Sequence, residues 1–455
     1  ASFMTDIFAA ADPFTTDGKE ITARKILDKG AEKLDASQIQ TRETRAQMLE
    51  AIGYAYHRQD VDDKAIPLLE KALTMRIEDG AEDLVLATNY FNLAEAQRGG
   101  GKEPTKASYN YDEALRLYVQ HYGHREHEHI ARVLIGQARL AQEKFNQLPR
   151  AEALLKEALG IYRSLYGNNH NEVGSTLSDL AGLALWNDEL ARAEEYQQEA
   201  LEIYKRLRAP GHPDHATALG ALGQIYLMRG KLTQAEPLIN DSIELQGQAF
   251  GKQSQRVAEM LEAKARLREH QGRYQEAVDL VTESVAMMTG INKGSDVTVG
   301  YSQDSLGNLK MKLGRPGEAE AHAATALAIY EASSLPRDHM YFASSHHLLG
   351  EALIAQGKAA QAAESLRTAI AICTKQTGAT SWRTARSQSA LGVALDMLGQ
   401  DVEAERLLIQ SYRTLAADPK ASAESRNLAH ERAVAFLRIR GRGSEVARLP
   451  ALPRT

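Results

Sequence analysis

The sequence is poor in cysteine, proline and aromatic residues. Of its 455 residues, one is cysteine, Cys373, 12 are proline and 6% are aromatic. A single cysteine excludes an internal disulfide and a zinc site built on paired cysteines, and it fits the cytosol as well as a periplasm. Because proline is rare and Ala, Leu, Glu, Gln and Arg are common, the composition favours helices.

The sequence also lacks an excess of charge and a long apolar run. The 54 Lys and Arg face 60 Asp and Glu, a formal net charge of −6, which gives no electrostatic reason to expect a nucleic acid partner. No run of eighteen apolar residues occurs, so we expect no membrane span. The glycine-rich stretch "RGGGKEPT" lacks the spacing of a phosphate loop, and no kinase motif is present. We therefore expect neither enzymatic activity nor a cofactor.

An alanine recurs instead about every 42 residues. It stands at Ala65, Ala107, Ala151, Ala193, Ala235, Ala277, Ala319, Ala362 and Ala404. Seven residues later there is always a second small residue: Ala72, Ala114, Ala158, Ala200, Ser242, Ser284, Ala326, Ala369 and Ser411. A Gly or Ala precedes each anchor by twelve or thirteen residues. Nine units of one period indicate a repeat architecture.

Each unit has the pattern of two helices joined by a turn. Apolar residues at helical spacing come first, as in "ALGALGQIYL", and a glycine such as Gly230 or Gly399 then suits a helix end. Small residues let two helices approach closely. We therefore expect Gly223 to contact Ala235 within its unit, and Ser242 to contact the next unit.

The repeated stretches resemble the tetratricopeptide repeat. They include "ALGQIYLMRGKLTQAEPLINDSI" and "SLGNLKMKLGRPGEAEAHAATAL", and the junctions "YGNNHNEV" and "PGHPDHA" are similar to the kinesin-light-chain subtype. The resemblance implies an all-α fold: a right-handed α-solenoid superhelix of about nine helix hairpins with helical caps. It also implies that the first helices line a concave groove that binds a protein or peptide.

Three segments follow from this pattern. Residues 1–40 are expected to form capping helices, residues 41–418 the nine repeats, and residues 419–455 a capping helix, Ala423 to Ile439, with a solvated basic tail. The alternative for this tail is that Arg438, Arg440 and Arg442 contact an acidic surface. The segment "FMTDIFAAADP" followed by "ITARKILDKGAEKL" also resembles the juxtamembrane part of bacterial transmembrane serine/threonine kinases whose repeat region is extracytoplasmic. That resemblance implies a sensor role.

The repeat register predicts which polar residues face the groove. The candidate ligand-binding residues are Asn92, Arg98, Arg132, Arg139, Ser178, Gln224, Arg266, Asn308 and His347. The same register places Tyr301, Asp304, Glu351 and Arg386 on that face. Amides suit a peptide backbone, and arginines suit an acidic side chain or a C-terminal carboxylate. The predicted peptide site spans Asn92 to Asn308.

A histidine cluster is the one metal candidate. His121, His124, His127 and His129 lie close in sequence, as zinc ligands do. However, His127 recurs as His170 and His212 at later junctions, which indicates a role in the turn. We predict no metal site.

The leading hypothesis is a non-enzymatic scaffold that binds a protein or peptide, acting as the periplasmic sensor or docking domain of a bacterial membrane serine/threonine kinase. One alternative is a cytoplasmic regulator that senses a peptide. The other is an adaptor that self-associates through its caps, for example as a homodimer.

Overall fold

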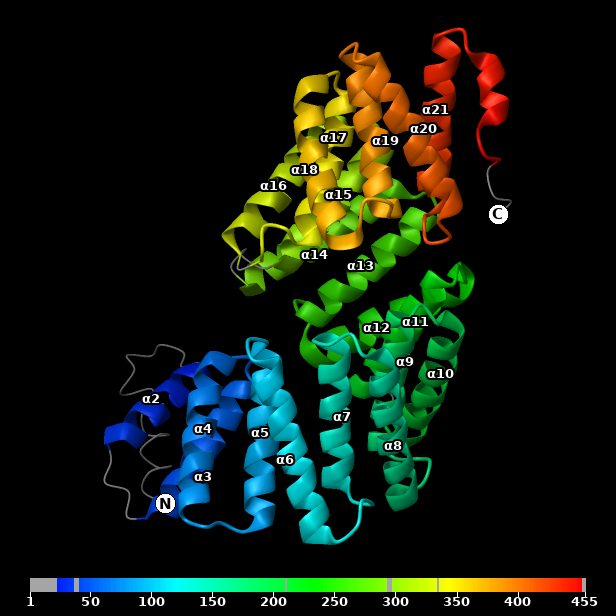
Figure 1. Cartoon of the computed structure of the whole chain (residues 1–455). Helices are drawn as coiled ribbons and strands as arrows, with labels where there is room; N and C mark the ends of the chain where they lie inside the picture. The colour runs from blue at the N-terminus through cyan, green and yellow to red at the C-terminus, as the bar shows by residue number, and fades with distance from the viewer. Residues whose placement is uncertain (1–22, 37–40, 209–210, 293–296, 334, 452–455) are drawn as a thin grey trace, which may run out of the picture. The chain divides into compact units, whose positions relative to one another are not determined.

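The computed structural model describes residues 23–36, 41–208, 211–292, 297–333 and 335–451, and within these ranges it contains helices and no strand (Figure 1). The chain divides into two compact units, Ala1–Pro210 and Gly211–Thr455. The all-helical prediction is confirmed for the described residues. The repeat pattern does not predict the boundary between the two units.

The first unit contains α2 (Ala23–Ala36), α3 (Arg42–His57), α4 (Asp62–Glu78), α5 (Asp83–Gly100), α6 (Pro104–Tyr122), α7 (Glu128–Glu143), α8 (Leu148–Tyr166), α9 (Asn171–Trp186) and α10 (Leu190–Leu207). The second unit contains α11 (Pro213–Met228), α12 (Leu232–Phe250), α13 (Gln255–His270), α14 (Tyr274–Asn292), α15 (Val297–Lys312), α16 (Pro316–Ala332), α17 (Met340–Ala355), α18 (Ala359–Thr377), α19 (Trp382–Met397), α20 (Asp401–Ala417), α21 (Ala423–Ile439) and a 3₁₀ helix, η2 (Gly443–Arg448).

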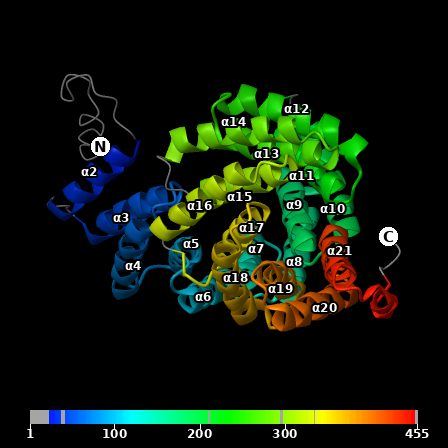
Figure 2. The ribbon, with the colours of Figure 1, turned by 90° about the horizontal axis from the view of Figure 1, so that it is seen from above.

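From α3 to α20, each odd-numbered helix packs on the even-numbered helix that follows it. Most odd helices also contact the next odd helix of their unit, as α3 contacts α5, α15 contacts α17 and α17 contacts α19. The odd helices therefore form an inner layer. Figure 2 shows α13, α15, α17 and α19 following one another on the inner side of the second unit, with α14, α18 and α20 outside them.

The repeated small residues are the most deeply buried positions of the fold. All nine anchor alanines are 0% exposed, and the nine residues seven positions later are 0–1% exposed. The close approach of helices is therefore confirmed. A methyl group on Gly223 would lie 2.8 Å from Ile239 Cγ1 and 3.4 Å from Leu238 Cβ, so these two side chains pack directly against the glycine.

The turn inside each hairpin needs a left-handed backbone. In later hairpins a glycine supplies it, as at Gly230 (φ 69°) and Gly399 (φ 74°). In earlier hairpins Asp60, Asn146 and Asp188 adopt the same conformation, with φ of 56°, 51° and 62°. Asn and Asp tolerate this region better than other side chains. The hairpin therefore closes at "EKFNQLPR" although that stretch departs from the repeat pattern.

Asp304 is buried and does not face a groove, which corrects the prediction from the repeat register. It lies on α15 with 7% of its surface exposed. Ser345 Oγ donates to its carboxyl at 2.7 Å, and Tyr330 Oη donates at 3.2 Å. Burial raises the pKa of Asp304 to about 7, although the two hydroxyl groups partly offset it. One carboxyl thus links α15, α16 and α17.

The C-terminal helix begins and ends where the sequence predicts it, at Ala423 and Ile439. The following arginines are not a solvated tail, which corrects the expectation for them. Arg440 pairs with Asp396 and Asp401 at 2.5 Å, and Arg442 pairs with Glu405 at 2.7 Å. At the other end, the second expected capping helix is present as α2, whereas the first, with its apolar residues at 3, 7 and 8, lies outside the described residues.

Gly392 provides a direct test of close helix packing. A methyl group there would lie 2.7 Å from Leu408 Cγ and 3.3 Å from the carbonyl oxygen of Ala404. We expect Gly392→Ala to lower the free energy of unfolding by about 1–3 kcal/mol. The matched control is Gly160→Ala on α8, where nothing lies within 4 Å and where helix propensity alone should stabilise by about 0.5–1 kcal/mol. Thermal and urea unfolding measure both, and equal effects would contradict the packing.

The raised pKa of the buried Asp304 carboxyl predicts that stability depends on pH. Because its folded pKa is raised, the folded chain keeps a proton that the unfolded chain has released, so the free energy of unfolding falls as pH rises from about 4 to 7. Asp304→Asn removes the charge, so the decrease in the free energy of unfolding between pH 5 and pH 8 should be smaller by about 2–3 kcal/mol. Urea titrations at both pH values measure this, with exposed Asp241→Asn as the control. An unchanged fall in Asp304→Asn would refute the assignment.

Candidate functional site

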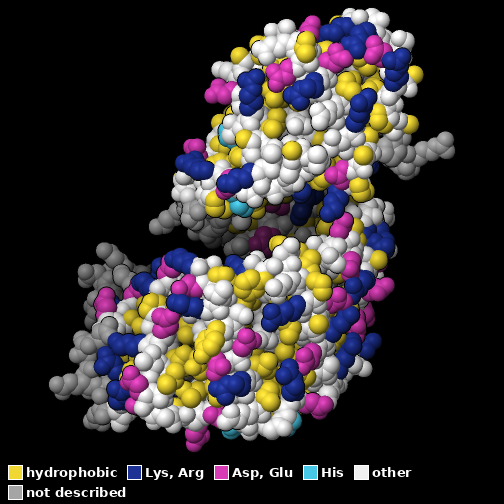
Figure 3. All heavy atoms as spheres, in the orientation of Figure 1, with side chains coloured by type: hydrophobic (Ala, Val, Ile, Leu, Met, Phe, Trp, Pro, Cys, Tyr) yellow, Lys and Arg dark blue, Asp and Glu magenta, His cyan; other side chains and the backbone are white. Residues whose placement is uncertain are grey.

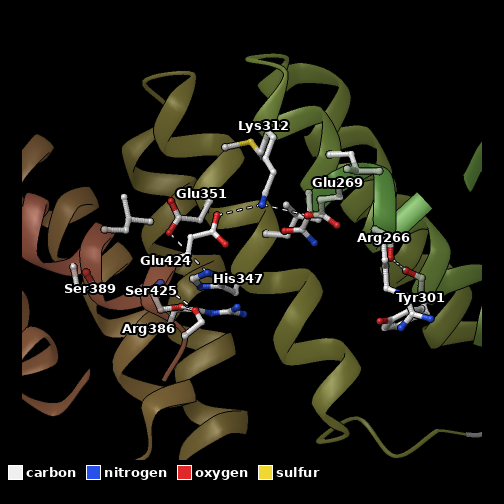
Figure 4. Close-up of a pocket in the computed structure, with 18 of the residues that line it drawn as sticks. Arg266, Glu269, Tyr301, Lys312, His347, Glu351, Arg386, Ser389, Glu424 and Ser425 are labelled. Atoms are coloured by element: carbon white, nitrogen blue, oxygen red, sulfur yellow. Dashed lines mark hydrogen bonds and ion pairs between the residues drawn. The ribbon is translucent and has the colours of Figure 1, made fainter. Parts of the chain in front are cut away.

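The inner layer of the second unit encloses a pocket of about 520 Å³. Its walls come from α13, α15, α17 and α19, and α21 covers one side (Figure 4). The volume lies in the range of small-molecule and peptide sites. The polar lining comprises Glu262, Arg266, Glu269, Tyr301, Ser305, Asn308, Lys312, His347, Glu351, Arg386, Ser389, Ser422, Glu424, Ser425 and Arg432. Apolar side chains complete it, among them Val281, Leu309, Met311, Leu348, Leu415 and Leu428.

Two ion pairs hold α21 over the pocket. Arg432 Nη2 lies 2.5 Å from Glu351 Oε2 on α17. Glu424 Oε1 lies 3.3 Å from Lys312 Nζ at the end of α15. Residues Ala433, Phe436 and Leu437 of α21 are buried as well. Helices that are three hairpins apart in sequence therefore meet across the pocket.

Lys312 sits between two carboxylates. Its Nζ lies 3.2 Å from Glu269 Oε1 and 3.3 Å from Glu424 Oε1. Burial by itself would lower the pKa of Lys312, but the two glutamates outweigh it and raise the pKa. One ammonium group is thus shared by two carboxylates, which leaves one negative charge in excess at this place.

The other side of the pocket is cationic. His347 Nδ1 lies 3.1 Å from Ser387 Oγ. Burial lowers the pKa of His347 well below 6.5, and Arg386 and Arg432 add to this effect, so the imidazole is neutral at pH 7. Glu351 already pairs with Arg432. The positive charge of Arg386 therefore has no carboxylate of its own.

Arg386 and Ser389 are polar groups without partners. Both lie on the same face of α19, three residues apart, and line the pocket. Arg386 makes no hydrogen bond or ion pair with any described residue, and its Nε and the Ser389 hydroxyl are buried without a hydrogen-bond partner. Burial lowers the pKa of Arg386, but a guanidinium stays charged in proteins. A buried charge without a partner is costly, so a ligand group would stabilise it.

Arg266 and Tyr301 form the far side, away from Arg386 (Figure 4). Both side chains are exposed, and Arg266 forms no ion pair within the described residues. Asn308 Nδ2 donates to the backbone oxygen of Asp304 at 2.8 Å, so its carbonyl oxygen remains for a ligand. Glu262 accepts hydrogen bonds from Ser284 and Ser302.

Three of the nine predicted site residues meet at this pocket: Arg266, Asn308 and His347. Gln224 lies on α11, outside the pocket lining. The register also anticipated Tyr301, Glu351 and Arg386. For the remaining predicted residues, which belong to the first unit, a ligand role stays a prediction.

In the first unit, the predicted residues have partners within the chain. Asn92 donates to Glu50 at 2.9 Å. Arg98 pairs with Glu95 at 3.1 Å and with Glu143 at 3.2 Å, and Arg139 pairs with Asp179 at 2.9 Å. The Arg132 guanidinium lies over the ring of Phe91, 5.0 Å from its centroid, and Ser178 is half-buried.

The repeat register does not predict eight of the polar lining residues: Glu269, Ser305, Lys312, Ser389, Ser422, Glu424, Ser425 and Arg432. The last four belong to α21 and the residue before it, a segment for which the sequence predicts only a cap. A signal was present: α21 begins 41 residues after α19, at Ala423 against Trp382, so the period continues into a tenth inner helix. An inner helix lines the groove by its position alone.

The histidine cluster has the turn role that its recurrence predicted. His127 precedes α7, and its Nδ1 accepts from the backbone N–H of His129 at 3.2 Å. At the start of α9, His170 Nδ1 accepts from the backbone N–H of Glu172 at 3.3 Å. At the start of α11, His212 Nδ1 accepts from the backbone N–H of Asp214 at 3.2 Å. Within the described residues, no group of three His, Cys, Asp or Glu side chains is arranged to hold a metal ion.

The outer surface differs from the pocket in its charge pairing. On the face shown in Figure 3, acidic and basic side chains are interspersed over both units. Many pair between successive hairpins, as Arg125 with Glu157 at 2.8 Å and Arg163 with Glu199 at 2.6 Å. None of the helices in the described ranges has both the length and the apolar character needed to cross a membrane.

Comparisons with known proteins agree with the repeated hairpins. One tetratricopeptide-repeat family matches residues 172–248 and 341–417, and a second matches residues 144–172. The sequence matches no curated protein. Among solved structures, a Podosopora anserina kinesin light chain with nearly identical repeats is 26% identical, over 45% of this chain and 96% of that chain, with a TM-score of 0.40.

Two further solved structures share the fold. RapI is 9% identical over 81% of this chain and 97% of its own, with a TM-score of 0.57. The quorum sensor NprR of B. thuringiensis is 15% identical over 72% of this chain and 83% of its own, with a TM-score of 0.52. The family matches show that residues 144–248 and 341–417 contain tetratricopeptide repeats, and the helix hairpins outside these ranges have the same buried small residues.

Proposed function

We propose that this chain is a peptide-sensing regulator and that the pocket of the second unit is its ligand site. The observation that carries the proposal is a pocket on the inner helix layer that contains two polar groups, Arg386 and Ser389, without partners among the described residues. A rigid scaffold with a preformed pocket of this kind suits ligand binding.

The lining favours a short peptide over a folded protein. About 520 Å³ admits a few residues at most, and one side is covered by α21. Leu348, Leu415 and Leu428 offer apolar contacts to side chains, whereas Asn308 offers an amide oxygen to a backbone N–H. NprR, which has the same fold, is described as a quorum sensor, and this supports a sensory role.

The kinase-sensor hypothesis rests on a different part of the chain. It depends on the resemblance of residues 3–34, of which residues 3–22 lie outside the described structure. Its periplasmic localisation, the cytoplasmic alternative and self-association as a homodimer all stay predictions. The absence of enzymatic activity also stays a prediction.

Filling the pocket should abolish peptide binding. The full chain is mixed with random-sequence pentapeptides, separated by gel filtration, and the retained peptides are identified by mass spectrometry. Ser305 of α15 lines the pocket, so Ser305→Trp should place an indole ring in the cavity. We expect this variant to bind the retained peptides at least tenfold more weakly, as measured by calorimetry.

The matched control places the same ring on the outer layer. Ala324 is exposed on α16 and does not line the pocket, so Ala324→Trp should bind peptides like the unmodified chain. Circular dichroism and thermal unfolding establish that both variants are folded. If no pentapeptide is retained, or if Ser305→Trp binds as tightly as Ala324→Trp, the proposed function is wrong.

A further inference from the structure

The charges of the pocket identify a more specific ligand, and this inference rests on the proposed function. We propose that the pocket binds a short peptide with two free termini: its carboxylate at Arg386 and Ser389, and its ammonium group at Glu269 and Glu424. Such a ligand is a small zwitterion, and the two sites bind its opposite ends.

The pocket as a whole is neutral. The charged lining residues are Arg266, Lys312, Arg386 and Arg432 on the positive side and Glu262, Glu269, Glu351 and Glu424 on the negative side. Four cations and four carboxylates cancel, and the imidazole of His347 is uncharged at pH 7. A polyanion or polycation would therefore bring an excess charge to a neutral pocket. A ligand with zero net charge would not.

The charges are nevertheless separated. Around His347, the guanidinium groups of Arg386 and Arg432 face one carboxylate, Glu351, which gives an excess of one positive charge. Around Lys312, two carboxylates face one ammonium group, which gives an excess of one negative charge. Figure 4 shows His347 and Arg386 on one side and Glu269 toward the other, with Glu424 and Lys312 between them. The two ends of the pocket thus differ in charge, and Glu424 between them attracts Arg386 as well as Lys312.

The carboxylate site is defined by donors without acceptors. Arg386 offers its guanidinium, including the buried Nε, and Ser389 offers a hydroxyl on the same face of α19. A carboxylate accepts two parallel hydrogen bonds from a guanidinium, which is the strongest pairing this side chain forms. Placing one there would satisfy both groups and cancel the local excess charge.

The ammonium site is defined by acceptors in excess of donors. Lys312 Nζ lies 3.2 Å from Glu269 Oε1 and 3.3 Å from Glu424 Oε1, so two carboxylates share one ammonium group. A terminal ammonium group has three N–H donors and fits two carboxylates. Because Glu424 belongs to α21, the ligand would also bridge α21 to α13, whose Glu269 it would share.

Blocking either terminus of the peptide tests the proposal. The full chain is titrated with one retained pentapeptide in four forms: free, N-acetylated, C-amidated and doubly blocked. We expect each single block to weaken binding about tenfold or more, as measured by calorimetry at pH 7 and at two salt concentrations. Salt should weaken binding of the free form more than that of the doubly blocked form.

Single substitutions assign the two ends. Arg386→Gln should remove the advantage of the free carboxylate, so that the free and C-amidated peptides bind equally, while N-acetylation still weakens binding. Glu269→Gln should remove the advantage of the free ammonium group, so that the free and N-acetylated peptides bind equally, while C-amidation still weakens binding. Arg383→Gln is the matched control, because Arg383 lies on the same helix outside the pocket, over the ring of Trp382, and it should leave all four affinities unchanged.

The outcomes separate this inference from the proposed function. If blocked and free peptides bind equally and Ser305→Trp still abolishes binding, the pocket is a peptide site but does not read the termini. If only C-amidation matters and Glu269→Gln has no effect, the ammonium site is wrong and the zwitterion proposal fails. If no form binds, the proposed function itself fails.

Discussion

The close approach of neighbouring helices is the constraint on which the rest of this structure depends. It is possible because nine alanines and nine further small residues, at one spacing, are completely or almost completely buried. A larger side chain at any of them would separate two helices and change the rotation from one hairpin to the next. The regular spacing of small side chains thus determines how tightly the inner layer turns.

In the second unit, this turn brings distant helices together around one space. α15 and α21 are three hairpins apart, yet Lys312 and Glu424 lie 3.3 Å from one another. The pocket is therefore a product of curvature, and its walls come from five successive inner helices. The residues on these walls combine paired charges with an unpaired guanidinium, and that combination gives the pocket its chemical character.

Buried polar groups in this unit fall into two classes. Asp304 is satisfied by Ser345 and Tyr330, and it links three helices without access to a ligand. Arg386 and Ser389 are not satisfied by any described residue. The repeat register placed Asp304 and Arg386 on the same face because both occupy inner helices. Only side-chain packing distinguishes the residue that joins helices from the residue that faces the cavity.

The period, the helix hairpins, the buried alanines and the histidine caps followed from the sequence alone, because each depends on residues that are near in the chain or repeat at one spacing. His127 and Ala235 are examples. The division into two units, the meeting of Lys312 with Glu424 across the pocket and the pairing of Arg440 and Arg442 were decided by tertiary structure. The first two depend on small rotations between hairpins that accumulate over several repeats, and the arginine pairs depend on how the end of the chain packs on α19 and α20, so no local pattern of residues records any of them.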